Sequence, residues 1–328
     1  IVDDWEGRVN SWPLDEGLID YTSADYGNEE NQLASLNVIA TPVFTLSGAN
    51  IDASLITPDL ISGTLHEADG IEANVASGYH AIEFLLWGQD LNGTNPGAGS
   101  RPFTDFANGD ACTNGNCDRR AAYLQSATDL LVADLEEMVE NWDTGGPARA
   151  AVTDDPQKGI LAILTGMGSL SYGELGGERM KLGLMLNDPE EEHDCFSDNT
   201  HNSHYYDGIG VRNVYLGTYT RTDGSILTGP ALAELVAAAD PAVAAQLRAE
   251  LDASVAALQA VKDAGDAGQT FDALIAPGNA EGEALILAAV DALVTQTSSI
   301  DRAVTALGLS RINFQGSDSL DSPAAVFQ

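Results

Sequence analysis

Basic residues are scarce in this 328-residue chain, which has 14 lysines and arginines against 50 acidic residues and a formal net charge of −36. Lysine occurs only at Lys158, Lys181 and Lys262. Such a surface repels nucleic acid and anionic membranes, so we expect no nucleic-acid partner. Acidity of this degree keeps a protein soluble and draws cations toward any cleft.

Aromatic residues are also few, at 6%, whereas alanine is abundant in many segments. This mixture favours helices over sheets. No apolar run has the length of a membrane span. The chain begins at Ile1 without a leader sequence, so we expect a processed or truncated piece. Its length suggests about two domains.

Cysteine occurs only three times. Cys112 and Cys117 flank the short loop TNGN and could close it as a local disulfide, which would leave Cys195 over. This hints at an exported protein, because disulfides persist in oxidising compartments. Cys195 could be a soft metal ligand or simply a buried thiol.

Helical periodicity, interrupted by loops rich in glycine and proline, dominates the chain. The segments 1–27 and 187–208 read as irregular. Helices are predicted over residues 28–40, 64–88, 118–142, 156–186, 230–239, 241–264 and 280–307. The stretch DTGGPAR at 143–149 is the best break, so we predict an all-α protein of two helical-bundle lobes, 1–148 and 149–328.

The stretch SGYHAIEFLLWGQD at 77–90 places His80 and Glu83 three residues apart in an apolar helix. Residues at this spacing share a face. Imidazole and carboxylate are good ligands for iron, zinc or copper. The alternative is that the two side chains bond to each other or to a neighbouring helix. Gly78 costs helix stability, about 1 kcal/mol against alanine, and suggests that something approaches the backbone closely.

The hypothesis of a zinc peptidase lacks support, because the motif is missing one metal ligand. Zincins need His-Glu-x-x-His and inverted zincins His-x-x-Glu-His, but Phe84 follows Glu83. His66 would lie about 21 Å away along one helix. Further ligands would come from the polar segment 190–207, whose alternative reading is a solvated acidic loop. Its candidates are Glu190, Glu191, Glu192, His193, Asp194, Asp198, His201, His204 and Asp207.

A second cluster of oxygen-bearing side chains surrounds the cysteine loop. It comprises Asp110, Asn114, Asn116 and Asp118 and superficially resembles calcium-site spacing. The full calcium-loop pattern is absent, so we do not expect calcium there.

Three motifs, in this order, resemble those of the imelysin family. NSWPLDEGLIDY is similar to its Trp-Pro element, and GYHAIEFLLWG matches its Gly-x-His-x-x-Glu signature. GGERMKLGLMLNDPEEEHDCFSDNTHNSHYYDGIGVRNVYLG resembles a segment of the iron-regulated branch. The matches cover residues 5–217, and the C-terminal helices carry no signature of their own.

The resemblance implies two related helical bundles with the functional site in the cleft between them. It also implies export to the periplasm or outer surface, and a role in iron acquisition. Carried over by motif, His80 and Glu83 of the first lobe would bind metal or ligand together with Asp198 and His201 of the second. Gly78, Glu178, Arg179, Asn199 and Cys195 would support them. Arg179 is expected to orient a carboxylate, because guanidinium has no acceptor.

We therefore expect an exported metal-binding protein of a bacterial iron-uptake system, with iron as its ion and zinc or copper as alternatives. The open alternative is a metal-free module that binds a peptide, a sugar or an iron chelate. Peptidase activity is disfavoured by the missing histidine. Expected partners are outer-membrane or periplasmic uptake proteins. Relatives usually carry helices before the Trp-Pro element, so these helices are expected to have been cut away, to be disordered or to be supplied by another chain.

Overall fold

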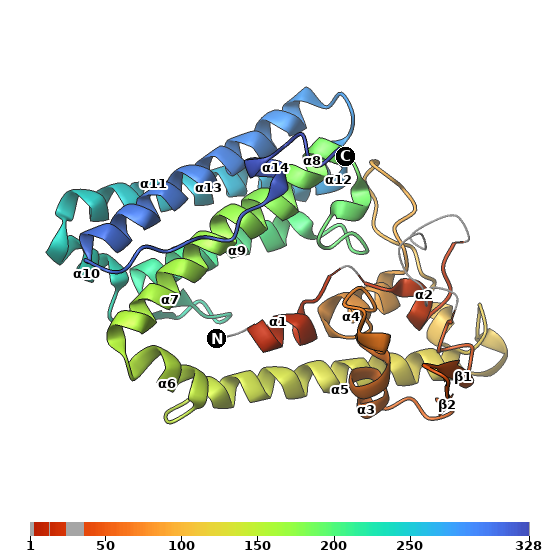
Figure 1. Ribbon diagram of the computed structural model, residues 1–328. Coiled ribbons are helices and arrows are strands. Elements are labelled where there is room, and N and C mark those ends of the chain that lie inside the picture. The colour runs from red at the N-terminus through yellow and green to blue at the C-terminus, as the bar shows by residue number, and fades with distance from the viewer. Residues whose placement is uncertain (1–2, 13, 24–35, 328) are drawn as a thin grey trace. The chain divides into compact units, whose positions relative to one another are not determined.

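The computed structural model describes residues 3–12, 14–23 and 36–327 (Figure 1). This part is predominantly helical, with two small antiparallel hairpins, so the all-α prediction is confirmed. The helix predicted over 28–40 lies mostly outside the described residues, and its described end, 36–40, is a turn. The chain divides into two compact units: the first is 1–91 with 98–151, and the second is 92–97 with 152–328.

The first unit begins with two short helices inside the segment that was predicted to be irregular. Its elements are α1 (Asp3–Val9), α2 (Glu16–Ile19), β1 (Val43–Leu46), β2 (Ala49–Asp52), α3 (Pro58–Leu60), the π-helical η1 (Ile61–Leu65), the 3-10 turn η2 (Ala68–Gly70), α4 (Gly78–Trp87), the 3-10 turns η3 (Phe103–Phe106) and η4 (Gly109–Ala111), α5 (Cys117–Trp142) and α6 (Pro147–Thr153). In the hairpin, Val43 pairs with Asp52 and Leu46 with Ala49.

The prediction of one helix over 64–88 is wrong, because α4 begins only at Gly78. Glu67 and Asp69 take left-handed φ values of 52° and 63°, which a continuing right-handed helix excludes. The Asn74 side chain then donates to the Ala68 carbonyl at 2.7 Å and closes a loop. The chain therefore turns back on itself before α4 starts.

The core of the first unit forms where α4 packs on α5. Phe84 and Leu85 of α4 and Tyr123 of α5 are completely buried. Gly78 takes a φ of +84°, and a Cβ at this position would lie 2.7 Å from the Val9 carbonyl oxygen. The close approach that the sequence suggested at Gly78 is therefore the backbone of α1.

The second unit is built of long helices. Its elements are α7 (Pro156–Ser169), the π-helical η5 (Leu170–Lys181), α8 (Leu182–Leu186), the 3-10 turn η6 (Pro189–Glu191), α9 (Thr200–Leu216), the hairpin β3 (Thr218–Thr220) and β4 (Ile226–Thr228), α10 (Leu232–Ala239), α11 (Pro241–Asp266), α12 (Phe271–Ile275), α13 (Ala280–Ala306) and α14 (Asp318–Asp321). The helices predicted over 156–186 and after 230 are confirmed, whereas the segment 187–208 is irregular only as far as residue 199.

Helix α13 is the central element of the second unit and packs against α11 and η5. By length and composition alone it is apolar enough to cross a membrane, contrary to the prediction that no run is long enough. Its side chains Ile286, Leu293 and Ile300 are instead completely buried within the unit. They therefore serve as core residues of a helical bundle.

The C-terminal segment of the second unit lies along the α7–η5 helix, where glycines leave room for it. A side chain at Gly173 would clash with the Gln315 carbonyl, and one at Gly177 would clash with Ser317. The Gln315 N–H donates to Ser169 Oγ at 3.0 Å. In Figure 1 this segment is the dark blue trace that ends near α14 and α8.

Candidate functional site

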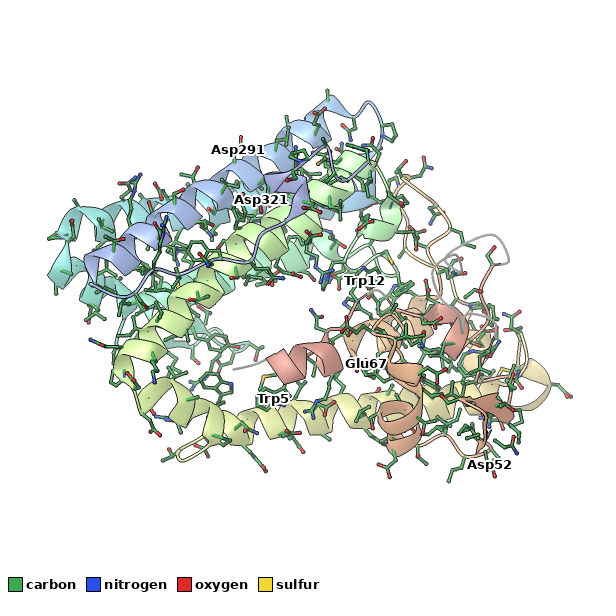
Figure 2. All side chains as sticks on the ribbon, in the orientation of Figure 1. Trp5, Trp12, Asp52, Glu67, Asp291 and Asp321 are labelled. Atoms are coloured by element: carbon green, nitrogen blue, oxygen red, sulfur yellow. A yellow bond between two sulfur atoms is a disulfide. The ribbon has the colours of Figure 1, made fainter. Side chains whose placement is uncertain are left out.

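The His80–Glu83 pair lies on the buried face of α4. His80 Nδ1 is 3.0 Å from Glu83 Oε2, and the side chains are 1% and 10% exposed. The rings of Trp12 and His80 meet in a T-shaped arrangement, with their centroids 5.0 Å apart; Trp12 is labelled in Figure 2. A carboxylate oxygen is an acceptor, so Nδ1 is the donor of this hydrogen bond. The two side chains therefore share one face of α4 and bond to each other, as in the alternative to metal binding that the sequence left open.

The Trp-Pro element supplies Trp12, whereas Pro13 lies outside the described residues. Helix α4 is fixed at its start by Gly78 against α1 and ends at Gly88, whose φ of 75° stops the helix. The Arg101 N–H then donates to the Trp87 carbonyl at 2.8 Å. Both ends of the helix that carries the pair are therefore held by backbone contacts.

A buried charge network, named here the Asp20 network, lies beside α4 in the first unit. Arg120 donates to both Asp20 oxygens, at 2.6 and 3.0 Å, and Arg101 donates to Asp20 Oδ2 at 2.7 Å. Tyr21 donates to Asp105 Oδ2 at 2.6 Å. Burial is the largest cause, and this hydrogen bond the second, of a rise in the pKa of Tyr21 to about 12. The acidic members of this network are thus matched by donors.

The cysteine loop also serves this network. Cys112 and Cys117 are joined by a disulfide. Between them, the Thr113 hydroxyl and the Asn114 amide donate to Asp105 Oδ1 at 2.7 and 2.8 Å. The loop that superficially resembled a calcium site thus supplies hydrogen-bond donors to the first unit.

The second unit contains three buried carboxylates, Glu192, Asp198 and Asp272, named here the carboxylate cluster, in which burial and the charges of Asp272 and Asp198 all raise the pKa of Glu192. Glu192 and Asp272 are 0% exposed and Asp198 is 7% exposed. Carboxylate oxygens of Asp198 and Asp272 lie within 4.8 Å of each other. The Gly97 N–H donates to Asp198 Oδ2 at 2.7 Å. Among the described residues, neither Glu192 nor Asp272 has a hydrogen-bond partner for its carboxylate oxygens.

The electrostatic state of Glu192 reflects this setting. Burial raises the pKa of Glu192 well above its usual range, and the neighbouring Asp272 charge raises it further. The Thr200 hydroxyl acts in the opposite direction, although its geometry falls short of a hydrogen bond. Within the described ranges, no lysine, arginine or histidine forms an ion pair with Glu192 or Asp272.

Asp198 and His201 stand at the start of α9, but their side chains meet different neighbours. The His201 ring packs against Gly265, and its Nε2 lies 3.4 Å from Asp266 Oδ1 at the end of α11. Burial lowers the pKa of His201. The Asp198 carboxylate instead meets Asp272. Asn199, which lies between Asp198 and His201 in the sequence, accepts a hydrogen bond from the Asn202 amide at 2.9 Å.

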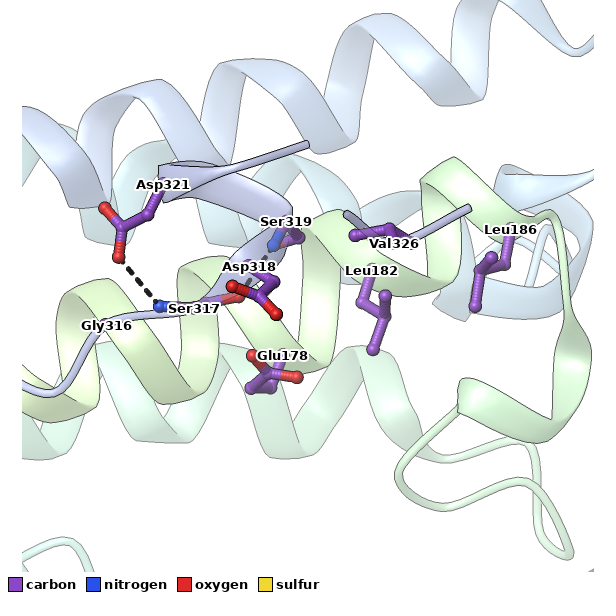
Figure 3. A pocket seen from close by; sticks show the side chains of 9 residues that line it. All are labelled: Glu178, Leu182, Leu186, Gly316, Ser317, Asp318, Ser319, Asp321 and Val326. Atoms are coloured by element: carbon purple, nitrogen blue, oxygen red, sulfur yellow. Dashed lines mark hydrogen bonds between the residues drawn. The ribbon is translucent and has the colours of Figure 1, made fainter. Parts of the chain in front are cut away.

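Arg179 and Glu178 lie on η5 and have separate surroundings. Two nitrogens of Arg179 contact the Glu174 carboxylate, at 2.7 and 2.8 Å. Glu178 faces a cavity of about 610 Å³ together with Asp318 of the C-terminal segment (Figure 3). Cys195 is buried and lies outside the disulfide.

Burial shifts the pKa values of two titratable groups on α9 in opposite directions. His204 is 1% exposed and packs its ring against Phe271, and burial lowers its pKa to about 3. Burial raises the pKa of Asp207 to about 7, and the Arg179 charge only partly offsets this. At neutral pH, His204 is therefore an uncharged imidazole inside the unit.

A cavity of about 710 Å³ lies in the first unit beside α1. His66 lines it, but both its nitrogens are engaged, Nε2 with the Gly7 carbonyl at 2.8 Å and Nδ1 with Ser77 Oγ at 3.2 Å. Since the chain turns back before α4, His66 lies next to Ser77 at the helix start, contrary to the straight-helix expectation. Its contacts tie α1 to this turn.

The carboxylate cluster includes a residue that sequence reasoning missed. Asp272 lies far along the chain from the polar segment 190–207 and carries no motif of its own. Only its place in the first turn of α12, directly after a buried phenylalanine, sets it apart from the many other acidic residues. No local signal could have paired it with Glu192.

Together these features define an all-α protein of two helical units, with a buried histidine–glutamate pair in the first and buried carboxylates in the second. The imelysin (peptidase M75) family model matches residues 1–300, and the chain belongs to the imelysin family.

Among solved structures, the fold is similar to the crystal structure of "a putative iron-regulated protein A precursor from Parabacteroides distasonis ATCC 8503". The TM-score is 0.61 at 15% sequence identity, and the match covers 93% of this chain and 75% of that one. At this identity the likeness shows a shared fold. No curated protein sequence matches the chain.

Proposed function

We propose that this protein is an exported iron-binding protein of a bacterial iron-uptake system. The observation that carries the proposal is the buried His80–Glu83 pair on α4. In the ligand set that the motifs suggested, Asp198 and His201 are the contributions of the second unit. The proposal includes no peptidase activity, because the second histidine of a zinc-peptidase motif is missing.

The chemistry of the pair supports metal binding. With Nδ1 as the donor to Glu83, a neutral His80 has its lone pair on Nε2, the form in which imidazole binds a metal ion. A carboxylate bonded to the other ring nitrogen is a common partner of metal-binding histidines, because it orients the ring and raises its basicity. Glu83 can also serve as a direct oxygen ligand if the ion draws it away from Nδ1.

Three further observations support the biological part of the proposal. The family relationship comes first, and the solved structure of similar fold is named for iron regulation. The disulfide Cys112–Cys117 suits an oxidising compartment outside the cytoplasm. The net charge of −36 favours cations over anions near the surface.

The experiment is elemental analysis of protein purified without a metal-chelating resin and exposed separately to ferrous iron, ferric iron, zinc or copper. Wild type should retain near-stoichiometric iron, and His80→Gln should lose it. Glu83→Gln should lose most of it, because an amide neither orients the imidazole in the same way nor carries charge. Exposed Glu72, in the same unit, gives the matched control Glu72→Gln, which should bind as wild type does.

Low and equal metal content in wild type and His80→Gln would overturn the proposal. It would favour a metal-free binding module, for which the cavity of about 710 Å³ in the first unit offers space. Preferential retention of zinc or copper would keep the site and change its ion. Circular dichroism of each variant establishes that a loss of metal does not reflect unfolding.

A further inference from the structure

The carboxylate cluster lies entirely in the second unit, and two of its three members are outside the ligand set proposed above. Glu192 follows η6, Asp198 precedes α9, and Asp272 stands in the first turn of α12. Two segments distant in sequence, the loop between η6 and α9 and the first turn of α12, therefore supply the buried acidic side chains. Glu192 and Asp272 are both 0% exposed.

Buried carboxylates need partners, because burial removes the water that would stabilise their charge. In the described part of the chain, the oxygens of Glu192 and Asp272 accept no hydrogen bond and meet no basic side chain. Protonation solves this only in part, since a neutral carboxyl group still leaves a buried carbonyl oxygen unmatched. A single cation satisfies oxygens from several carboxylates at once and neutralises their repulsion.

The donor set indicates the kind of cation. The cluster offers oxygen alone, which suits hard cations rather than the softer ions that favour imidazole or thiolate. Calcium binds oxygen at 2.3–2.6 Å, so two oxygens on one ion lie at most about 5 Å apart. The Asp198 and Asp272 oxygens, within 4.8 Å of each other, meet this limit. Magnesium usually keeps several waters, which suits fully buried side chains less well.

We propose that Glu192, Asp198 and Asp272 bind a hard divalent cation of the calcium type within the second unit. The Gly97 N–H holds one Asp198 oxygen at 2.7 Å and thereby orients the carboxylate. The site shares Asp198 with the proposed iron ligands, but Glu192 and Asp272 make it separable from them by mutation.

Calcium is the probe, added to chelator-treated full-length protein at fixed ionic strength. Calorimetric titration should give one ion per chain. At a hundred times the dissociation constant, the melting temperature should rise by about 5–10 °C. Glu192→Gln and Asp272→Asn should each weaken binding at least about tenfold, since loss of even an outer partner of a metal ligand does so. If Asp272→Asn does not fold, Glu192→Gln carries the test.

Two variants serve as controls. Asp291 is an exposed aspartate on α13 (Figure 2), and Asp291→Asn should bind calcium as wild type does. His80→Gln should lose iron yet keep the calcium response, so the two proposals can fail independently. The calcium site is refuted if wild type neither binds calcium nor gains stability from it. It is equally refuted if both cluster variants bind as wild type does, or if Asp291→Asn weakens binding as much as they do.

Discussion

The two units bury acidic side chains to the same extent but surround them differently. In the first unit, Asp20 is 2% exposed and accepts hydrogen bonds from Arg101 and Arg120. In the second, Glu192 and Asp272 are 0% exposed, and the described residues supply no basic partner. Burial alone therefore does not distinguish a structural charge from a binding group. The partners of the buried charge make this distinction. A basic side chain inside the fold neutralises a structural carboxylate, whereas a buried carboxylate without such a partner can bind an ion from outside.

The substitution Asp20→Asn is the most direct test of this difference between the two units. Asp20→Asn would leave two buried guanidinium groups without their shared anion. We expect a loss of about 3–5 kcal/mol in the free energy of unfolding, the usual consequence of removing one partner of a buried ion pair. Urea unfolding followed by circular dichroism measures it. A loss below about 1 kcal/mol would mean that Asp105 alone satisfies both arginines.

The pH dependence of stability that Asp207 causes is a second test, made in the second unit. Its pKa rises from 3.8 in the unfolded chain to about 7 in the fold, so the folded state keeps a proton that the unfolded state releases. Stability is therefore lost as pH rises through this window. Asp207→Asn should gain about 2–4 kcal/mol near pH 8 and little below pH 4. Thermal unfolding at both pH values decides it, and an equal gain at both would contradict the shifted pKa.

The disulfide is a third test, because it closes the loop whose side chains donate hydrogen bonds to Asp105 in the first unit. Replacing Cys112 and Cys117 with serine should cost about 2 kcal/mol, as expected for a loop of this length. Chemical unfolding of the double variant should match that of wild type in a reducing buffer. If the double variant is as stable as oxidised wild type, the hydrogen bonds of the loop hold it without the crosslink.

The smallest expected effect comes from Glu192. In chelator, Glu192→Gln should change the free energy of unfolding by at most about 1 kcal/mol, and a gain is more in keeping with the repulsion that it removes. The contrast with Asp20→Asn, measured by the same urea titration, is the critical quantity. A loss as large as that of Asp20→Asn would show that Glu192 has an internal structural partner.

Local sequence pattern predicted the long helices of the second unit, because each carries its own apolar periodicity and clear end signals. It failed over 64–77, where the left-handed residues Glu67 and Asp69 interrupt an apolar pattern. Neither residue type forbids a helix. The turn depends on the Asn74 bond and on contacts of His66 with α1, which are not local.

The same limit applies to the candidate site. His80 and Glu83 were predictable, because a spacing of three places both on one helix face. The polar segment 190–207 contains Glu192 and Asp198, but its composition could not indicate which of its many acidic residues are buried. Asp272 could not be paired with them at all, since only the packing of the second unit brings α12 to that segment.

The glycine-lined path of the C-terminal segment constrains the order in which the second unit can assemble. Gly173 and Gly177 are covered by Gln315 and Ser317, which follow them by about 140 positions along the chain. During synthesis, this face of η5 stays uncovered until the segment that contains Gln315 and Ser317 has left the ribosome. The second unit can therefore complete its fold only after this segment has been synthesised, so a long-range docking step should limit its folding rate.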